Sequence, residues 1–370
     1  MGYYLNPTTG LRNYTRTKNA HYFVDKTNLI RQVNLQITNN ERFINVSRPR
    51  RFGKTTVIDM LDSYYGKSSK EVFEGLKITQ KLENNIYNTF GEYTGNNIIR
   101  ISFNKVFTNG KFEEEINSLK EDLLAELNEV FDIPDRITNL TRALDYTGEQ
   151  FVFLVDEWDY IFHAHGYKQR DYERFTTFLM ELFKDEGYIT LVFMVGILPP
   201  QSYSNASNLN NFSLFDITRD KKYEDYFGFT ESEVENLVSR QQELSLQEIK
   251  AWYNGYLSPI GKNIYNPNSV ITALRNERCD NYWKDSGTTT PIYDFLKFNT
   301  ADTKQDIVNM LMGNRIVIEL SLPLKAGEPI AHSKEKIYAA LVMYGNLGYF
   351  EGKVYIPNEE LRLEYEKLKL

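Results

Sequence analysis

The segment that decides the fold runs from Phe43 to Thr56 and reads Phe43-Ile44-Asn45-Val46-Ser47-Arg48-Pro49-Arg50-Arg51-Phe52-Gly53-Lys54-Thr55-Thr56. Its apolar start is typical of a strand, and the following residues, Thr55 to Tyr65, have the apolar spacing of a helix. The loop between them ends in Gly-Lys-Thr, the second half of a phosphate-binding loop, and Arg48 stands where that motif has its first glycine. A strand before the loop and a helix after it are the context that the motif requires.

The residue types of this loop suit a triphosphate. Backbone N–H groups ahead of a helix point at phosphate oxygens, and the helix dipole adds to the attraction. Gly53 permits close approach, Lys54 reaches the β and γ phosphates, and the Thr55 hydroxyl ligates magnesium. A bare Gly-Lys-Thr also occurs in ordinary basic turns. We predict that ATP binds to the whole loop, with one of its three arginines as a γ-phosphate clamp: Arg48, Pro49, Arg50, Arg51, Phe52, Gly53, Lys54, Thr55 and Thr56.

A second signal is the apolar run Phe151 to Val155, which leads directly into Asp156 and Glu157. A strand without polar alternation is buried on both faces, as in the centre of a parallel sheet. Carboxylates at the edge of a core are costly, so they need an explanation. We predict that Asp156 and Thr55 hold Mg²⁺, and that Glu157 and Lys54 are catalytic, with Glu157 polarising the attacking water. The alternative is a capping acid at a strand-to-helix turn, with Asp159 as the cap.

The first half of the chain alternates strand-like and helix-like segments. Further strands are expected at 98–103 and 190–195, and helices at 113–130 and 172–183. This alternation predicts an α/β fold with a parallel-sheet P-loop NTPase core. The strand at 190–195 should lie between the two motif strands. Its tip, Val195-Gly196, has no polar residue to sense the γ phosphate, and Gln201, Ser202 or Asn205 are possible substitutes.

The pattern changes after about residue 212. Short helices are expected at 231–242, 245–253, 268–275, 301–313 and 334–344. The last is followed by a hairpin over 348–356 that turns at Glu351-Gly352, and a helix followed by a small hairpin is the shape of a winged-helix end. We predict a P-loop ATPase core over 1–212 and a mainly helical domain with a winged-helix-like end over 213–370, with the boundary in the Asn/Ser-rich stretch 202–211 or shortly after it.

Composition narrows the function classes. The 370 residues carry a net charge of −7, so the chain as a whole is not a nucleic-acid-binding polyelectrolyte, although a local basic face remains open. Its single cysteine, Cys279, excludes a disulfide within the chain and fits a reducing compartment. The N-terminus lacks the features of a signal peptide, and no apolar run has the length of a membrane span. We therefore expect a cytoplasmic protein with no membrane association.

Together these residues resemble the bacterial AAA-ATPase-like family over nearly the whole chain. In that family the phosphate loop also lacks its first glycine, so the resemblance accounts for Arg48, whereas the strand tip usually reads Thr-Gly rather than Val195-Gly196. Members often carry a C-terminal PD-(D/E)XK nuclease-like domain, which would begin about where the chain ends at Leu370. The sequence shows no nuclease constellation of paired acids and a lysine after a strand, so we predict no nuclease activity. The matching motifs are 22–27, 48–55, 155–159, 208–212, 226–230, 252–256, 265–267, 282–283 and 356–360.

Three functions stay open at this point. The first is an ATPase whose hydrolysis drives an unknown conformational or regulatory output. The second is a weakly hydrolysing, nucleotide-dependent switch, which the missing sensor favours. The third is a DNA-binding module, in which DNA or a protein partner binds the C-terminal domain near Lys334 and Lys336. The sequence does not indicate an oligomeric state.

Overall fold

The computed structural model describes residues 2–67, 70–81, 90–184, 186–201, 209, 211–283, 301–320, 323–328 and 333–368. The chain forms two compact units. The first comprises Met1–Val46, Thr55–Gly196 and Pro200–Leu214, and the second comprises Ser47–Lys54, Ile197–Pro199 and Phe215–Leu370. The phosphate loop is thus grouped with the second unit, although the strand before it and the helix after it lie mainly in the first.

The first unit is built on a five-stranded sheet with the order β2-β3-β4-β1-β5. Strand β3 pairs in parallel with both β2 and β4, and all six of its residues are buried, which explains its lack of polar alternation. The prediction that the strand near residue 190 lies between the two motif strands is confirmed. The strands are β1 (Phe43–Ser47), β2 (Asn97–Ser102), β3 (Phe151–Asp156), β4 (Ile189–Gly196) and β5 (Ser213–Asp216).

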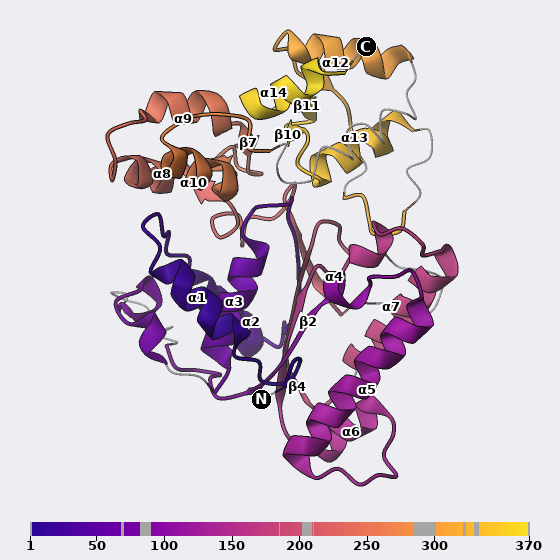
Figure 1. Cartoon of the computed structure of the whole chain (residues 1–370). Coiled ribbons are helices and arrows are strands. Elements are labelled where there is room, and N and C mark those ends of the chain that lie inside the picture. Colours follow the sequence, from indigo (N-terminus) through magenta and orange to yellow (C-terminus); the bar gives the residue numbers. More distant parts are fainter. Residues whose placement is uncertain are drawn as a thin grey trace. The chain divides into compact units, whose positions relative to one another are not determined.

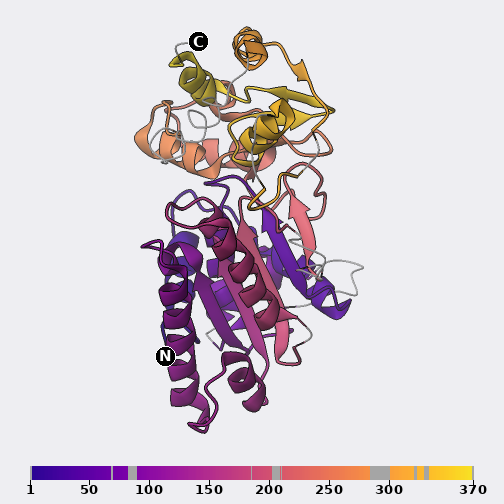
Figure 2. The same cartoon turned by 90° about the vertical axis from the view of Figure 1, so that its right-hand side faces the viewer.

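Helices cover both faces of this sheet, which confirms the predicted α/β core. On one face lie α1 (Thr9–Lys18), α2 (Asn28–Thr38) and α3 (Lys54–Tyr65) (Figure 1). On the other lie α4 (Phe103–Val106), α5 (Phe112–Phe131), α6 (Leu140–Tyr146) and α7 (Gln169–Phe183), with the strands visible behind them in Figure 2. Short 3₁₀ turns span Lys70–Phe73, Lys77–Thr79 and Tyr160–Phe162. The helix predicted at 113–130 is α5, which buries Ile116, Leu119, Leu123 and Leu127 along one side.

The second unit contains short helices and two small sheets, ordered β6-β8-β7 and β10-β11-β9. Helix α8 ends at Val238, earlier than the sequence pattern indicated. The elements are β6 (Phe229–Thr230), α8 (Glu231–Val238), α9 (Leu246–Tyr253), β7 (Tyr256–Leu257), β8 (Asn263–Tyr265), α10 (Pro267–Asn276), α12 (Ala301–Leu311), β9 (Ile316–Val317), α13 (Lys334–Met343), β10 (Gly348–Phe350), β11 (Lys353–Tyr355) and α14 (Glu359–Glu366).

The predicted hairpin is present, since β10 and β11 pair antiparallel around Glu351 and Gly352. Both turn residues have positive φ, 49° and 73°, as a tight two-residue hairpin turn requires. The winged-helix interpretation of this end stays a prediction. None of the helices in the described residues has the length and apolar character that a bilayer crossing needs.

The apolar core of the second unit gathers side chains from α12, α13, α14 and the strands between them. It also includes Phe52 of the phosphate loop, whose side chain is completely buried. The Phe52 ring meets the Tyr256 ring edge-on, with centroids 5.2 Å apart. One residue of the loop is therefore a core residue of the second unit.

Candidate functional site

The phosphate loop has a buried face and an open face. Arg48, Pro49 and Phe52 are buried, with Arg48 only 2% and Phe52 0% exposed. Arg50 and Gly53 are half-buried, and Arg51 is exposed. The buried face of the loop is thus formed by Arg48, Pro49 and Phe52, and its open face by Arg50, Arg51 and Gly53. A ligand in solution meets the open face.

The backbone of the loop turns sharply just before α3. Arg51 and Gly53 both lie in the left-handed region, with φ of 68° and 85°. A Cβ on Gly53 would meet no atom within 4 Å, so the backbone conformation rather than space is what favours glycine there. Turns of this kind direct successive N–H groups into an anion-binding concavity. The first turn of α3 carries no acidic residue, and Thr55 and Thr56 are exposed in it.

Lys54 is the first residue of α3 and is 8% exposed. Its Nζ donates to the carbonyl oxygens of Arg48 and Pro49, each at 2.8 Å. The ammonium group therefore folds back over its own loop. Phosphate oxygens in the concavity would compete with these two carbonyls for the same ammonium protons.

Arg48, one of the three candidate phosphate clamps, is engaged by protein groups. Its Nη2 donates to Asp220 Oδ2 at 2.5 Å, and its Nη1 donates to the carbonyl oxygens of Ser47 and Phe215, each at 3.0 Å. The Arg48 guanidinium also lies over the Phe227 ring, 5.3 Å from its centroid. The arginines on the open face are Arg50 and Arg51.

The two predicted acids lie at the carboxyl end of β3. Asp156 is 4% exposed, and its Oδ1 accepts the Glu157 N–H at 3.0 Å. Glu157 is half-buried and has a φ of 49°, which is unusual for a residue with a Cβ. Such backbone strain is concentrated at functional sites, where the surrounding structure maintains it. The next residue, Trp158, donates its N–H to the Val195 carbonyl of β4 at 3.2 Å.

Asp159 does not act as a side-chain cap, contrary to the alternative interpretation of these acids. It precedes the turn Tyr160–Phe162 without a capping hydrogen bond, and its Oδ2 instead pairs with His163 Nε2 at 2.9 Å. A Cβ on Gly196, at the tip of β4, would lie 2.5 Å from Asp159 Oδ1 and 2.7 Å from the Trp158 ring. A glycine at this tip therefore lets the β3 turn pack closely against β4.

A charged cluster next to the acids was not found from the sequence. Arg100 of β2 contacts Asp59 Oδ1 at 2.7 Å and Asp62 Oδ2 at 3.2 Å. Burial raises the pKa of Asp62 to about 6, although Arg100 opposes the shift. Burial also raises the pKa of Asp59, and the Asp156 carboxylate adds to that increase, which indicates that Asp59 lies near Asp156. An arginine inside the apolar run Ile98–Ile101 was the signal for this cluster.

The two predicted metal ligands, Thr55 and Asp156, carry oxygen donors of the type that magnesium takes. Among the described residues, no group of three or more His, Cys, Asp or Glu side chains could enclose a metal. Magnesium does not need such an enclosure, because it keeps several waters and binds one or two carboxylates together with phosphate oxygens. The Asp156 carboxylate and the Thr55 hydroxyl are hard oxygen donors of that kind.

Other sequence candidates have ordinary positions or lie outside the described residues. Tyr253 and Tyr256 are buried, 0% and 2% exposed, so they pack in the core rather than at an open surface. Gln201 is half-buried in the stretch after β4. The other sensor candidates, Ser202 and Asn205, lie outside the residues that the structure describes, as does most of the predicted boundary stretch.

Comparisons with known proteins add to this geometry. The AAA-ATPase-like family, described as predicted AAA-ATPase, matches residues 8–204. The "uncharacterized protein in vnfD 5' region" of Azotobacter chroococcum mcd 1 is 27% identical over 303 residues, which cover 80% of this chain and 56% of that protein. The chain thus spans little more than half the length of this relative. A solved structure, the Walker-type ATPase PABY2304 of Pyrococcus abyssi, has a TM-score of 0.48 at 11% identity, covering 91% of this chain and 94% of its own.

Proposed function

Because the chain belongs to the predicted AAA-ATPase family, we propose that it binds ATP with Mg²⁺ and hydrolyses ATP to ADP and phosphate. The observation that carries the proposal is the left-handed turn at Arg51 and Gly53, which leads straight into α3. A loop of this shape presents N–H groups to phosphate oxygens at the positive end of a helix dipole. Arg50 and Arg51 on the open face supply further positive charge toward a triphosphate.

Four of the predicted site residues have distinct chemical roles in this proposal. Lys54 exchanges its two loop carbonyls for β- and γ-phosphate oxygens and stabilises the charge that develops on them. Thr55 and Asp156 hold the metal, which neutralises charge on the phosphate oxygens when it is bound. Glu157 orients a water and accepts its proton as the water oxygen attacks the γ phosphorus. The bond to the β–γ bridging oxygen breaks, and ADP leaves.

The test is steady-state phosphate release by the wild type and by Glu157→Gln. Loss of a general base reduces the rate by about 10²- to 10⁴-fold, and we expect a decrease in that range with little change in nucleotide affinity. Glu121→Gln, on the exposed side of α5, is the matched control and should keep the wild-type rate. Equal rates for the wild type and Glu157→Gln would reject catalysis by this residue.

A second candidate is a nucleotide-dependent switch that hydrolyses ATP only slowly. The observation that favours it is the apolar tip of β4, where Val195 offers no side-chain group to sense the γ phosphate. The same assay separates the two candidates, because a switch would bind ATP tightly while the wild type releases phosphate no faster than Glu157→Gln.

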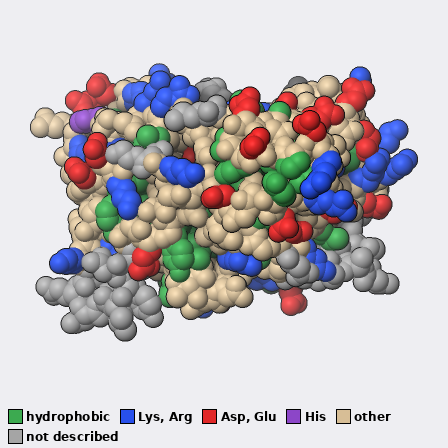
Figure 3. All heavy atoms as spheres, turned by 90° about the horizontal axis from the view of Figure 1, so that it is seen from below, with side chains coloured by type: hydrophobic (Ala, Val, Ile, Leu, Met, Phe, Trp, Pro, Cys, Tyr) green, Lys and Arg blue, Asp and Glu red, His purple; other side chains and the backbone are tan. Residues whose placement is uncertain are grey.

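The DNA-binding alternative lacks such support. Lys334 pairs with Asp306 at 2.5 Å, and Lys336 with Glu328 at 3.6 Å, so both lysines proposed for DNA are in ion pairs. Figure 3 draws a different face, seen from below, and there too basic and acidic side chains lie side by side. Phosphate-backbone binding needs basic residues that gather on one surface. We therefore leave the output of hydrolysis as an unidentified conformational or regulatory change.

A further inference from the structure

The polar contacts that hold the buried face of the phosphate loop to the second unit come from one segment, residues 215–228, while the Phe52 ring packs on Tyr256. Arg48 binds the Phe215 carbonyl, the Asp220 carboxylate and the Phe227 ring of this segment. At the other side of the loop, the Phe52 carbonyl accepts the Gly228 N–H at 3.1 Å. One short segment thus holds the loop at both ends of its buried face.

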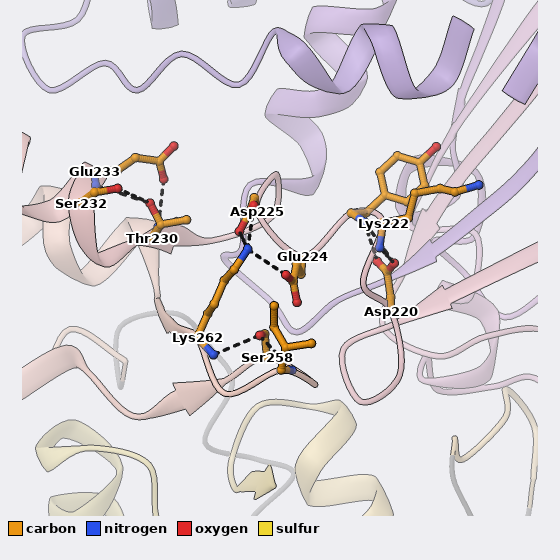
Figure 4. Close-up of polar contacts among 11 residues, drawn as sticks. Asp220, Lys222, Glu224, Asp225, Thr230, Ser232, Glu233, Ser258 and Lys262 are labelled. Atoms are coloured by element: carbon orange, nitrogen blue, oxygen red, sulfur yellow. Dashed lines mark hydrogen bonds and ion pairs between the residues drawn. The ribbon is translucent and has the colours of Figure 1, made fainter. Parts of the chain in front are cut away.

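Backbone N–H groups hold the Asp220 carboxylate independently of Arg48. Its Oδ1 accepts the backbone N–H groups of Lys222 at 2.6 Å and Tyr223 at 3.0 Å, and Figure 4 shows this turn. Its Oδ2 is the oxygen that binds Arg48, and the two side chains are only 3% and 1% exposed. A carboxylate held by two backbone donors can orient a guanidinium without moving.

We propose that Asp220 is a positioning residue for the phosphate loop: it holds Arg48 in the second unit and so sets the loop backbone for phosphate binding. This inference rests on the proposed function and deepens it. An arginine at the position of the first glycine has a long side chain that must not fill the phosphate concavity. The ion pair with Asp220 places that side chain in the protein interior, and a preformed loop loses less freedom when the nucleotide binds.

Because of this ion pair, the backbone conformation of the loop depends on the Asp220 carboxylate. Without Asp220 the buried Arg48 guanidinium would lose the carboxylate with which it forms its ion pair, which is strongly unfavourable. The side chain would then move toward water, and the backbone between Arg48 and Phe52 would move with it. Nucleotide affinity should fall although Asp220 itself does not contact the nucleotide.

The experiment measures the Kd of a fluorescent ATP analogue with Mg²⁺ for the full chain and its variants, at a temperature where circular dichroism shows each of them folded. Asp220→Asn should raise the Kd at least tenfold. Asp225→Asn is the matched control, because this acid lies five positions on, pairs with Lys262 at 3.0 Å and is half-exposed. It should keep the Kd within twofold of the wild type.

The double variant Arg48→Met/Asp220→Leu separates positioning from stability. Replacing a buried ion pair by apolar side chains of similar volume often leaves stability unchanged. A wild-type Kd in this folded variant would overturn the proposal, and a Kd raised at least tenfold would support it. Should Asp220→Asn fail to fold, Asp220→Glu keeps the charge and shifts the carboxylate by one methylene, and the same two outcomes apply. If the wild type itself binds no nucleotide, the proposed function fails instead.

Discussion

The phosphate loop and the acidic tip of β3 are held in different ways. The loop depends on residues far away in the sequence, since Arg48 and its partner Asp220 are 172 positions apart. The tip depends on nearby groups of its own unit: the Glu157 N–H binds Asp156, and Trp158 bonds to β4. If the loop binds the nucleotide and the tip hydrolyses it, as proposed, then affinity and turnover depend on separate parts of the chain. Substitutions should therefore separate these two quantities.

The largest effect is expected beside the tip, where Arg100 lies between Asp59 and Asp62. Arg100→Met leaves two buried carboxylates without their cation, and removal of one partner from a buried ionic group costs about 3–5 kcal/mol. The free energy of unfolding in urea should fall by that amount. Arg174→Met, which removes an exposed pair with Glu113, is the control and should change it by less than about 1 kcal/mol. Equal effects of the two substitutions on the free energy of unfolding would show that the cluster of Arg100, Asp59 and Asp62 does not stabilise the chain beside the β3 tip.

The next effect concerns Glu360, a buried acid of the second unit that forms no ion pair within the part of the chain that the structure describes. Glu360 is 0% exposed, its Oε1 accepts the N–H groups of Tyr282 and Trp283, and burial raises its pKa from 4.5 to about 7. The folded chain keeps this proton while the unfolded chain loses it. Stability contributed by the protonated group is therefore present below pH 4.5 and is lost as the pH rises to about 7.

Glu360→Gln should remove this loss, because the amide is neutral at every pH and can still accept the two backbone donors. At pH 8 the variant should exceed the wild type by up to roughly 3 kcal/mol in the free energy of unfolding, with no gain at pH 4. Urea unfolding across this pH range is the measurement. Glu366→Gln, a partly exposed acid in the same helix, should show no such gain. A pH-independent difference between wild type and Glu360→Gln would contradict the account.

The smallest effect is expected at the left-handed turn of the phosphate loop, at Gly53. Gly53→Ala forces an alanine into a φ of 85°, at a cost of about 1–2 kcal/mol. Nucleotide affinity should weaken about tenfold if the chain relaxes out of the left-handed turn. Gly187→Ala is the control, since it has neither a positive φ nor an atom within 4 Å of the added Cβ. Equal affinities for both variants would mean that this turn does not shape the phosphate site.

Local sequence patterns were sufficient for four of the five strands of the sheet, including the two that carry the motifs, whereas the edge strand β5 (Ser213–Asp216) was not predicted. The apolar run before Asp156 predicted a strand buried on both faces, and β3 is paired on both sides. The Glu351-Gly352 pair between two strand-like segments predicted a hairpin turn, and both residues have positive φ, although asparagine or aspartate is more usual than glutamate at the first position. Each of these signals depends on residues that are adjacent in the sequence.

The long-range ion pairs that hold the site, Arg48 with Asp220 and Arg100 with Asp59, could not be predicted from local patterns. Asp220 stands before two lysines and resembles any polar turn, and nothing local indicates that its carboxylate binds Arg48. Asp59 lies on α3 and its ion-pair partner Arg100 lies on β2, so the acids on α3 gave no signal by themselves. Long-range pairing depends on topology, which one sequence does not specify residue by residue.

All the roles proposed above depend on phosphates binding to the loop that leads into α3. Calorimetric titration of ATP with Mg²⁺ into the wild type and Lys54→Ala tests it most directly. Loss of charge-assisted hydrogen bonds worth about 1.5–3 kcal/mol should weaken binding about 10- to 100-fold in the variant. Undiminished affinity of Lys54→Ala would contradict the account.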